Sequence, residues 1–380
     1  MINSKINTLG SKLSLIYNMH EDFASFLILA LIIIIIIVYI SYSIYMSQLE
    51  AKECNYLNTL YPSINGNIKS ISPSISDCSG NLFDYYIKTA FNACSGGSYK
   101  NDYVDICVLK SILKQGVRCL DFEIYNIDNN PVVSTSTTNN YFVKETFNYV
   151  KFSDVMNTIS NYAFSGGTVP NPKDPLLIHL RIKSNEQAMY TNLANIFKSY
   201  DKLMLGKNYS YENYGKNIGG QPLTSFMNKI ILIIDKSNNS GFENKKFMEY
   251  VNLTSNSAFM RALTYYEVKN TPDINELEEY NKKCMTIVYP DTGADASNPS
   301  NPSGIVCRAA GCQMVAMRYQ FIDNYLKENA IFFNEGGFAF VLKPANLRYT
   351  EVTIPMPTPQ NPAYSYQTRN VTTDYYNFNY

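Results

Sequence analysis

Asp121 and Glu123 stand two positions apart in a segment whose neighbouring side chains are apolar. In a strand, both carboxylates would point to one face while Leu120, Phe122 and Ile124 point to the other. Two carboxylates on one strand face can together hold a cation. The alternative interpretation is a solvated strand end, where the acidic pair has no chemical role.

A second apolar segment carries basic groups at alternate positions, His179, Arg181 and Lys183. In a strand these three side chains share one face. A guanidinium can bridge two carboxylates through paired charge-assisted hydrogen bonds, so we expect Arg181 to form an internal ion cluster with Asp121 and Glu123. His179 is interpreted as a packed or mouth-lining residue, because a lone histidine lacks the partner that a catalytic pair requires.

Alternating helical and strand-like segments position these groups. A helix ending at Gly116 precedes a strand over 117–125, and the same order of helix and strand recurs up to a buried strand at 229–235. Such alternation predicts a parallel sheet, and roughly 270 residues suit a closed eight-stranded barrel. The predicted fold class is α/β, a TIM-like (β/α)8 barrel preceded by a single transmembrane helix.

The chain divides into seven predicted segments. They are an N-terminal segment (1–22), a transmembrane helix (23–46), a stalk (47–80), a first half-barrel (81–236), an insertion (237–280), a second half-barrel (281–349) and an extended or disordered tail (350–380). The helix assignment rests on a charge-free run from Phe23 to Leu49, which exceeds the roughly 20 residues needed to cross the hydrocarbon of a bilayer.

The orientation of this helix follows from few charges. Lys5 and Lys12 precede the apolar run, and Lys52 follows it. This weak bias favours an N-terminus inside and a barrel outside the cell or in a lumen. The predicted location is therefore a single-pass membrane protein, and a virion membrane is one setting that fits.

Charge and cysteine usage exclude two classes of partner. Lys and Arg number 32, as do Asp and Glu, so no net charge attracts nucleic acid. None of the eight cysteines stands in a CxxC pair or near a metal-spaced histidine, which argues against zinc. The cysteines are interpreted as buried free thiols; the alternative is local disulfides between Cys54 and Cys78 and between Cys284 and Cys307.

Several strings along the chain are distinctive as a set. One is Gly-Val-Arg-Cys-Leu-Asp-Phe-Glu at 116–123, and another is Ala-Gly-Cys-Gln-Met-Val-Ala-Met at 310–317, followed by Gly-Gly-Phe-Ala-Phe-Val-Leu-Lys-Pro at 336–344. Shorter strings lie at 152–155 and 229–232. In this order they resemble the X and Y boxes of eukaryotic-type phosphoinositide-specific phospholipase C, and the chain resembles this family over roughly 83–349.

The resemblance implies that both catalytic histidines are lost. The family's two histidine positions fall on Phe91 and Thr137. The whole chain contains two histidines, His20 beside the apolar run and His179 in a predicted strand. Loss of one general acid or base typically costs about 10² to 10⁴ in rate.

The resemblance also implies a vestigial calcium site. Three of the family's ligand positions fall on Asn92, Asp121 and Glu123, which keep oxygen ligands, while the fourth falls on Arg181. We therefore expect no cofactor, with Arg181 as the replacing cation. Two positions that grip ring phosphates in the family fall on Ile233 and Asp235.

Three functions are compatible with these residues. The first is a membrane-anchored phospholipase C-like pseudoenzyme that acts as a scaffold or interaction protein. The second is an active phosphatidylinositol phosphodiesterase with altered catalytic residues, which would use calcium. The third is a lipid or glycan binder without turnover. The expected partners are the lipid bilayer, through the N-terminal helix, and phospholipid head groups or other membrane and structural proteins.

Overall fold

The computed structural model describes residues 2–138, 142–293 and 295–350, and in the tail residues 355–361, 364, 366 and 368–380. The chain divides into two compact units, Met1–Arg348 and Tyr349–Tyr380. The first unit holds the N-terminal helix and the barrel, and the second is the tail.

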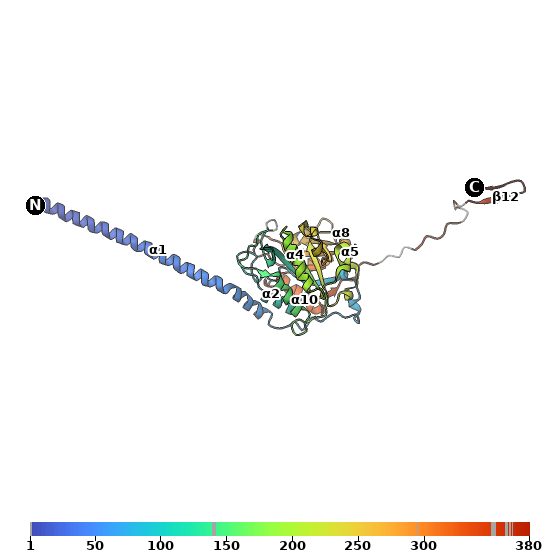
Figure 1. Cartoon of the computed structure of the whole chain (residues 1–380), viewed down its shortest axis with the longest axis horizontal. Coiled ribbons are helices and arrows are strands. Elements are labelled where there is room, and N and C mark those ends of the chain that lie inside the picture. The colour runs from blue at the N-terminus through green and yellow to red at the C-terminus, as the bar shows by residue number, and fades with distance from the viewer. Residues whose placement is uncertain are drawn as a thin grey trace. The chain divides into compact units, whose positions relative to one another are not determined.

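Eight parallel strands form a nearly closed barrel (Figure 1). Their hydrogen-bonded order is β7-β6-β5-β2-β1-β10-β9-β8, and among the described residues no ladder joins β7 to β8. The predicted TIM-like α/β fold is thus confirmed. The barrel strands are β1 (Tyr85–Ala90), β2 (Cys119–Ile127), β5 (Leu176–Lys183), β6 (Ile230–Asp235), β7 (Leu253–Ser255), β8 (Met260–Thr264), β9 (Met285–Tyr289) and β10 (Met314–Met317).

Three further strands extend this sheet. A hairpin of β3 (Asn130–Ser134) and β4 (Val150–Lys151) continues from β2, and β11 (Phe340–Leu342) pairs antiparallel with β1. Because β11 is the last strand of the first unit and β1 the first, this pairing ties the two ends of the barrel sequence together.

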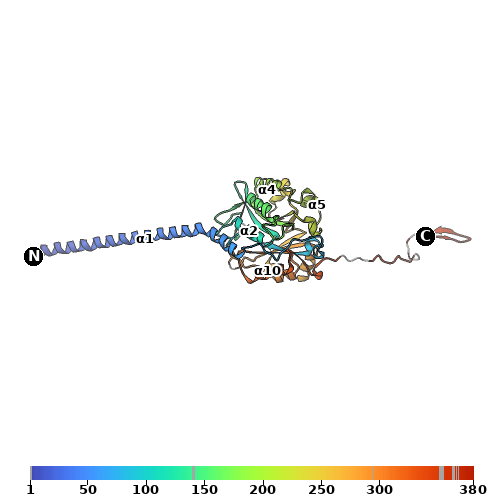
Figure 2. The same cartoon turned by 90° about the horizontal axis from the view of Figure 1, so that it is seen from below.

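Helices surround the strands, and Figure 2 shows α4 and α10 on opposite sides of them. Asp105 caps the start of α2 by accepting a hydrogen bond from the Cys107 amide, and Gly116, with φ +76°, lies in the turn that leads into β2. The helices are α1 (Ile2–Leu60), α2 (Ile106–Lys114), α3 (Phe152–Thr158), α4 (Gln187–Ser199), α5 (Tyr211–Tyr214), α6 (Lys245–Met248), α7 (Tyr265–Lys269), α8 (Ile274–Lys283), α9 (Gly304–Ala309) and α10 (Asn324–Gly336).

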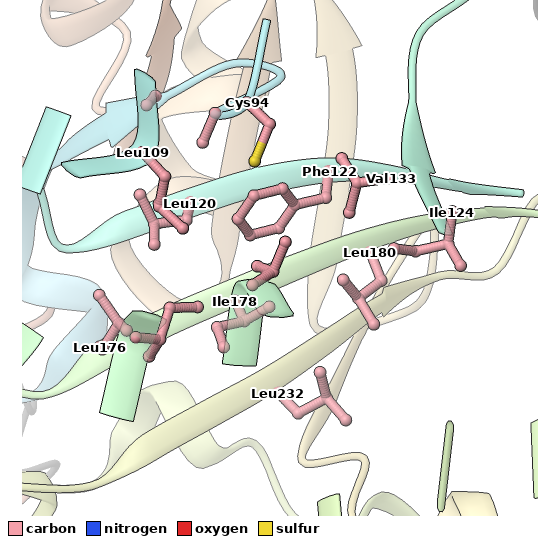
Figure 3. Close-up of a cluster of buried hydrophobic side chains, with 14 of the residues drawn as sticks. Cys94, Leu109, Leu120, Phe122, Ile124, Val133, Leu176, Ile178, Leu180 and Leu232 are labelled. Atoms are coloured by element: carbon pink, nitrogen blue, oxygen red, sulfur yellow. The ribbon is translucent and has the colours of Figure 1, made fainter. Parts of the chain in front are cut away.

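Side chains alternate along β2 as its sequence predicts. Leu120, Phe122 and Ile124 are buried in a cluster with Ile178 and Leu180 of β5 and with residues of the surrounding helices (Figure 3). The intervening residues of both strands point into the barrel, which has its own apolar cluster that includes Cys119 of β2 and Leu177 of β5 and reaches Phe91. The core therefore forces the polar residues of β2 and β5 onto the inner face.

The prediction of an insertion at 237–280 was wrong. This stretch supplies two barrel strands, β7 and β8, together with α6, α7 and most of α8. The strands were missed because they are short, three and five residues, and because β7 ends in two polar residues. A strand of this length has no periodicity that a sequence pattern can detect.

The predicted stalk at 47–80 was also wrong. Helix α1 continues to Leu60, and Leu57 near its end is fully buried in the core. Ile68 and Ile71, in the irregular chain that follows, are buried against the barrel. Part of this segment therefore packs on the barrel through apolar side chains that are not periodic, while others, such as Tyr56, stay exposed.

The first interpretation, buried free thiols, holds for five cysteines, and the local disulfides considered as the alternative do not form. Cys54 of α1 is bonded to Cys107 of α2, 53 residues away. The other described cysteines are free thiols, and all are buried except Cys284, which is partly exposed. The pairing follows from α1 packing beside α2, which no sequence spacing encodes.

Helix α1 includes the apolar run, and its stretch Phe23–Leu60 is long and apolar enough to cross a membrane. Side chains from Phe26 to Leu29 and from Leu31 to Ile40 are exposed, as expected for a segment without protein partners. In the tail, the described residues are irregular except for a hairpin of β12 (Asn370–Thr372) and β13 (Asn377–Asn379).

Candidate functional site

Five polar side chains meet inside the barrel at the carboxyl ends of β1, β2 and β5. In the parallel register of β2 and β5, Asp121 lies beside His179 and Glu123 beside Arg181. Asn92 follows β1 with φ 45°, a left-handed conformation that asparagine tolerates. Its main-chain N–H donates to Asp121 Oδ2 at 3.2 Å. Strand register and one turn thus place all five together.

The guanidinium of Arg181 lies at the centre of this group. Its Nε donates to Asp121 Oδ1 at 3.0 Å and its Nη2 to Asp121 Oδ2 at 2.7 Å. Its Nη1 donates to Glu123 Oε1 at 2.6 Å, and Nη2 also donates to Asn92 Oδ1 at 2.8 Å. The structure therefore brings together the four residues that the sequence analysis assigned to a calcium site and its replacing cation. We call these four residues the Arg181 cluster.

Burial and charge oppose each other in the Arg181 cluster. Asp121 is fully buried and Arg181 is 6% exposed. Burial alone would raise the pKa of Asp121, but Arg181 and His179 hold it well below its usual range. Burial would likewise lower the pKa of Arg181, yet Asp121 and Glu123 raise it. Asp121 and Arg181 thus remain charged because each meets an opposite charge.

Two aromatic rings cover the guanidinium. The Arg181 Cζ lies 4.6 Å from the centroid of the Phe91 ring and 5.3 Å from that of Tyr289. Both distances are within the range of cation–π attraction. Phe91, which the resemblance aligns with a family histidine, therefore packs against Arg181.

His179 lies beneath the cluster and is fully buried. Its Nδ1 is 2.8 Å from Asp121 Oδ1, and its Nε2 is 2.9 Å from the hydroxyl of Ser255 at the end of β7. Of the two interpretations of His179, packed or mouth-lining, the packed one is confirmed, because these two buried partners hold the ring below the cavity. Ser255 was missed altogether, since nothing in the pattern of its short strand marks it.

A cavity of about 790 Å³ opens above the Arg181 cluster. Lys183 and Thr137 line it, as do Phe91, Asn92 and Glu123. The pKa of Lys183 is lowered, chiefly by burial and also by the charge of Arg181. Thr137 donates its amide and its hydroxyl to Glu145 Oε2, at 2.6 and 2.5 Å. Thr137 is thus at the mouth, but it is held away from the Arg181 cluster by a different carboxylate.

The positions assigned to phosphate-gripping lysines differ from each other in exposure. Ile233 is fully buried in the interior of the barrel. Asp235 lines the cavity, and its Oδ1 accepts hydrogen bonds from Ser237 and Asn256. The cavity wall therefore has a carboxylate where a phosphate ligand would need a cation.

Family models match most of the barrel. The model described as phosphatidylinositol-specific phospholipase C, X domain, matches residues 78–236, and the Y-domain model of the same enzyme matches 227–346. Together the two matches cover 78–346, more than half of the chain. No curated protein sequence matches the chain.

Solved structures share the fold at low sequence identity. PLC21 from L. pealei has a TM-score of 0.58 and 18% identity over 72% of this chain. PLC21 from S. officinalis has a TM-score of 0.57, also with 18% identity over 72% of this chain. In both cases the alignment covers 38% of the other protein, so the chain matches well under half of their length.

The barrel topology, the order of its strands and the matches to both halves agree with one another. The X-domain match contains β1, β2, β5 and β6, and the Y-domain match contains β7 to β10. The chain therefore belongs to the phosphatidylinositol-specific phospholipase C family, with X and Y domains that form one TIM-like barrel.

Proposed function

We propose that the chain is a membrane-anchored, non-catalytic member of this family that uses its barrel as a scaffold or interaction module. The observation that carries the proposal is the guanidinium of Arg181, which is hydrogen-bonded to Asn92, Asp121 and Glu123. These are the positions at which the family resemblance places calcium ligands.

The Arg181 cluster does not suit a calcium ion. Calcium takes six to eight oxygen ligands. Here Asn92 Oδ1, both oxygens of Asp121 and one oxygen of Glu123 already accept hydrogen bonds from Arg181. The other oxygen of Glu123 accepts from the Tyr125 hydroxyl at 2.6 Å. A calcium ion would have to displace a buried cation that two carboxylates hold.

The pair of histidines that the resemblance assigns to the family's reaction is also missing from the described part of the cavity wall. Phe91 and Thr137 occupy the histidine positions, and neither side chain transfers protons near neutral pH. Without that pair, a phosphodiester would retain most of its barrier to the family's reaction in this cavity. This supports a barrel that retains the fold of the family but has no catalytic activity.

One arrangement favours the alternative, an active phosphodiesterase with altered residues. Ser255, His179 and Asp121 form a hydrogen-bonded chain in the order that activates a nucleophilic serine in hydrolases. However, Ser255 and His179 are both fully buried, and Asp121 is shared with Arg181. A substrate in the cavity would not reach either the hydroxyl or the imidazole.

A turnover assay decides between these functions. The full chain in nanodiscs that contain phosphatidylinositol or its 4,5-bisphosphate would be incubated with calcium, and released inositol phosphates would be measured by mass spectrometry. We expect no release above protein-free nanodiscs, with an active phospholipase C as the positive control. Release that disappears in Asp121→Asn would overturn the proposal and establish the alternative.

The membrane assignment rests on α1 and on the disulfide. The apolar part of α1 is long enough to span a bilayer, and the Cys54–Cys107 bond is typical of an oxidising compartment. Both support an N-terminus inside and a barrel outside or in a lumen; a virion membrane is one such setting. Protease digestion of sealed, right-side-out vesicles tests this orientation. We expect the barrel to be degraded without detergent, and a barrel that is degraded only after detergent is added would contradict the orientation.

A further inference from the structure

The cavity above the Arg181 cluster is lined by more acidic than basic side chains. Two cations line it, Arg181 and Lys183, against four carboxylates: Glu123, Asp235, Glu267 and Asp291. Arg181 is already engaged by Glu123 and by Asp121 behind it. A phosphorylated ligand would therefore meet excess negative charge, and a metal ion would meet a guanidinium at the floor.

Two hydrogen-bonding groups at the floor have no partner. Among the residues that the structure describes, neither Asn92 Nδ2 nor the Tyr99 hydroxyl makes a hydrogen bond, although both residues line the cavity. Each of the two residues is 3% exposed. Leaving a buried polar group unpaired is unfavourable, so both groups are positioned to bind an oxygen atom of a ligand.

The rim adds acceptors. Asp235, Glu267 and Asp291 each use one carboxylate oxygen to accept hydrogen bonds from the protein. Within the described part of the chain, the second oxygen of each accepts none. The cavity thus offers donors at its floor and acceptors at its rim, a combination that matches hydroxyl groups, which both donate and accept.

The rim also carries an exposed ring. Tyr266 lines the cavity and is 67% exposed, although the residue is fixed by a hydrogen bond from its amide to Asp291 Oδ1 at 2.7 Å. A tyrosine with a rigid backbone and an open ring face offers an apolar platform at low entropic cost. The aliphatic face of a sugar ring can pack on such a platform while its hydroxyls reach the polar groups.

We propose that this cavity binds an uncharged sugar ring of a glycan. The inference rests on the proposed non-catalytic function and names the chemistry of the partner. Neutral hydroxyls satisfy Asn92 and Tyr99 at the floor and the carboxylates at the rim, and they create no charge that the cavity leaves unpaired. Neither a phosphorylated inositol nor a divalent cation does this.

Saturation-transfer NMR on the full chain in nanodiscs tests the proposal. The probes are the methyl glycosides of glucose, galactose, mannose and N-acetylglucosamine, with inositol 1,4,5-trisphosphate as competitor. We expect saturation transfer to at least one neutral glycoside, unchanged by EDTA and by the trisphosphate at equal concentration. Absence of transfer to all four glycosides, or displacement by the trisphosphate, would overturn the proposal.

Variants connect the signal to the cavity. Tyr99→Phe removes a hydroxyl that has no partner, so the midpoint of thermal unfolding should not fall, while sugar affinity should drop about five-fold, as expected for one neutral hydrogen bond. Tyr266→Ala should weaken binding at least as much. Tyr149→Ala, at an exposed tyrosine beside a different cavity, is the matched control and should change nothing. Equal affinity in all three variants would place the sugar elsewhere and sink the proposal.

Failure of this proposal and failure of the proposed function are distinguishable. Release of inositol phosphate in the turnover assay would overturn the non-catalytic function, whatever the sugar results. If no inositol phosphate is released and no glycoside shows saturation transfer, the glycan proposal is wrong and the non-catalytic function is still supported.

Discussion

The barrel mouth and the helix layer around β1 both bury a cation, but they treat its charge in opposite ways. At the mouth, Arg181 meets Asp121 and Glu123, and its pKa is raised above the ordinary value. In the helix layer, Lys88 of β1 donates to the Gln115 carbonyl at 2.8 Å and lies over the Phe333 ring of α10. Burial lowers the pKa of Lys88 to about 7.

The difference shows what a buried charge needs. Two carboxylates in paired geometry can offset the cost of removing a guanidinium from water, whereas one carbonyl and a ring edge cannot do so for an ammonium. Lys343, after β11, repeats the second case: its Nζ donates to the Asn281 carbonyl at 2.8 Å, and burial lowers its pKa to about 7. The mouth is therefore a permanent ion cluster, and the two lysines titrate.

The largest expected effect comes from removing the cation at the mouth. Arg181→Met leaves the buried carboxylates of Asp121 and Glu123 without the cation that offsets their charge, which should cost about 3–5 kcal/mol of unfolding free energy. Thermal unfolding of the full chain in nanodiscs measures it. The control is Arg261→Met: Arg261 makes a bidentate pair with Glu276 at the surface, worth at most about 1 kcal/mol. Similar losses in both variants would show that the mouth cluster contributes little to stability.

A charge reversal sharpens the same comparison. Arg181→Glu places a third carboxylate beside Asp121 and Glu123 and removes the competing guanidinium. We expect this variant to be unstable without metal and to gain about 2.7 kcal/mol when calcium reaches 100 times its dissociation constant. The unfolding midpoint, measured with and without calcium, reports the gain. A calcium-dependent rise in the wild type would contradict the assignment of Arg181 as the replacing cation.

The residues at the mouth could be predicted from the sequence better than those in the helix layer. Strand alternation predicted that Asp121 and Glu123 share one face of their strand. The family resemblance, rather than a local rule, assigned Arg181 to the same site, and the register of β2 and β5 places it there. The burial of Lys88 depends on α2 and α10 covering β1, and a lone lysine in a sequence usually indicates a solvated position. Ser255 was missed for a similar reason, since its strand exists only through its pairing with β6.

The pH dependence of stability tests the helix layer. A lysine whose folded pKa is about 7 and whose unfolded pKa is near 10.4 destabilises the fold fully below pH 7. This cost declines as pH rises from 7 towards 10, because the unfolded chain then binds more protons than the folded one. Stability should therefore rise by at most about 1.4 kcal/mol per pH unit for each such lysine. Unfolding midpoints between pH 7 and 9 measure the slope. A flat profile would mean that Lys88 and Lys343 stay charged in the folded protein over this range, so that burial does not lower their pKa.

The smallest expected effect is the most direct contrast with the mouth. Lys88→Met keeps the length and packing of the side chain and removes an ammonium that has no carboxylate, so at pH 7 we expect stability to be unchanged or to rise by about 1 kcal/mol. The same change at the mouth, Arg181→Met, should destabilise the protein severely. Lys88→Met should also remove the contribution of one lysine to the pH dependence of stability. Lys69→Met, at a solvent-exposed position, should leave that dependence unchanged. If Lys88→Met destabilised the protein as much as Arg181→Met does, a carbonyl and a ring would suffice to hold a buried cation, and the two regions would not differ in kind.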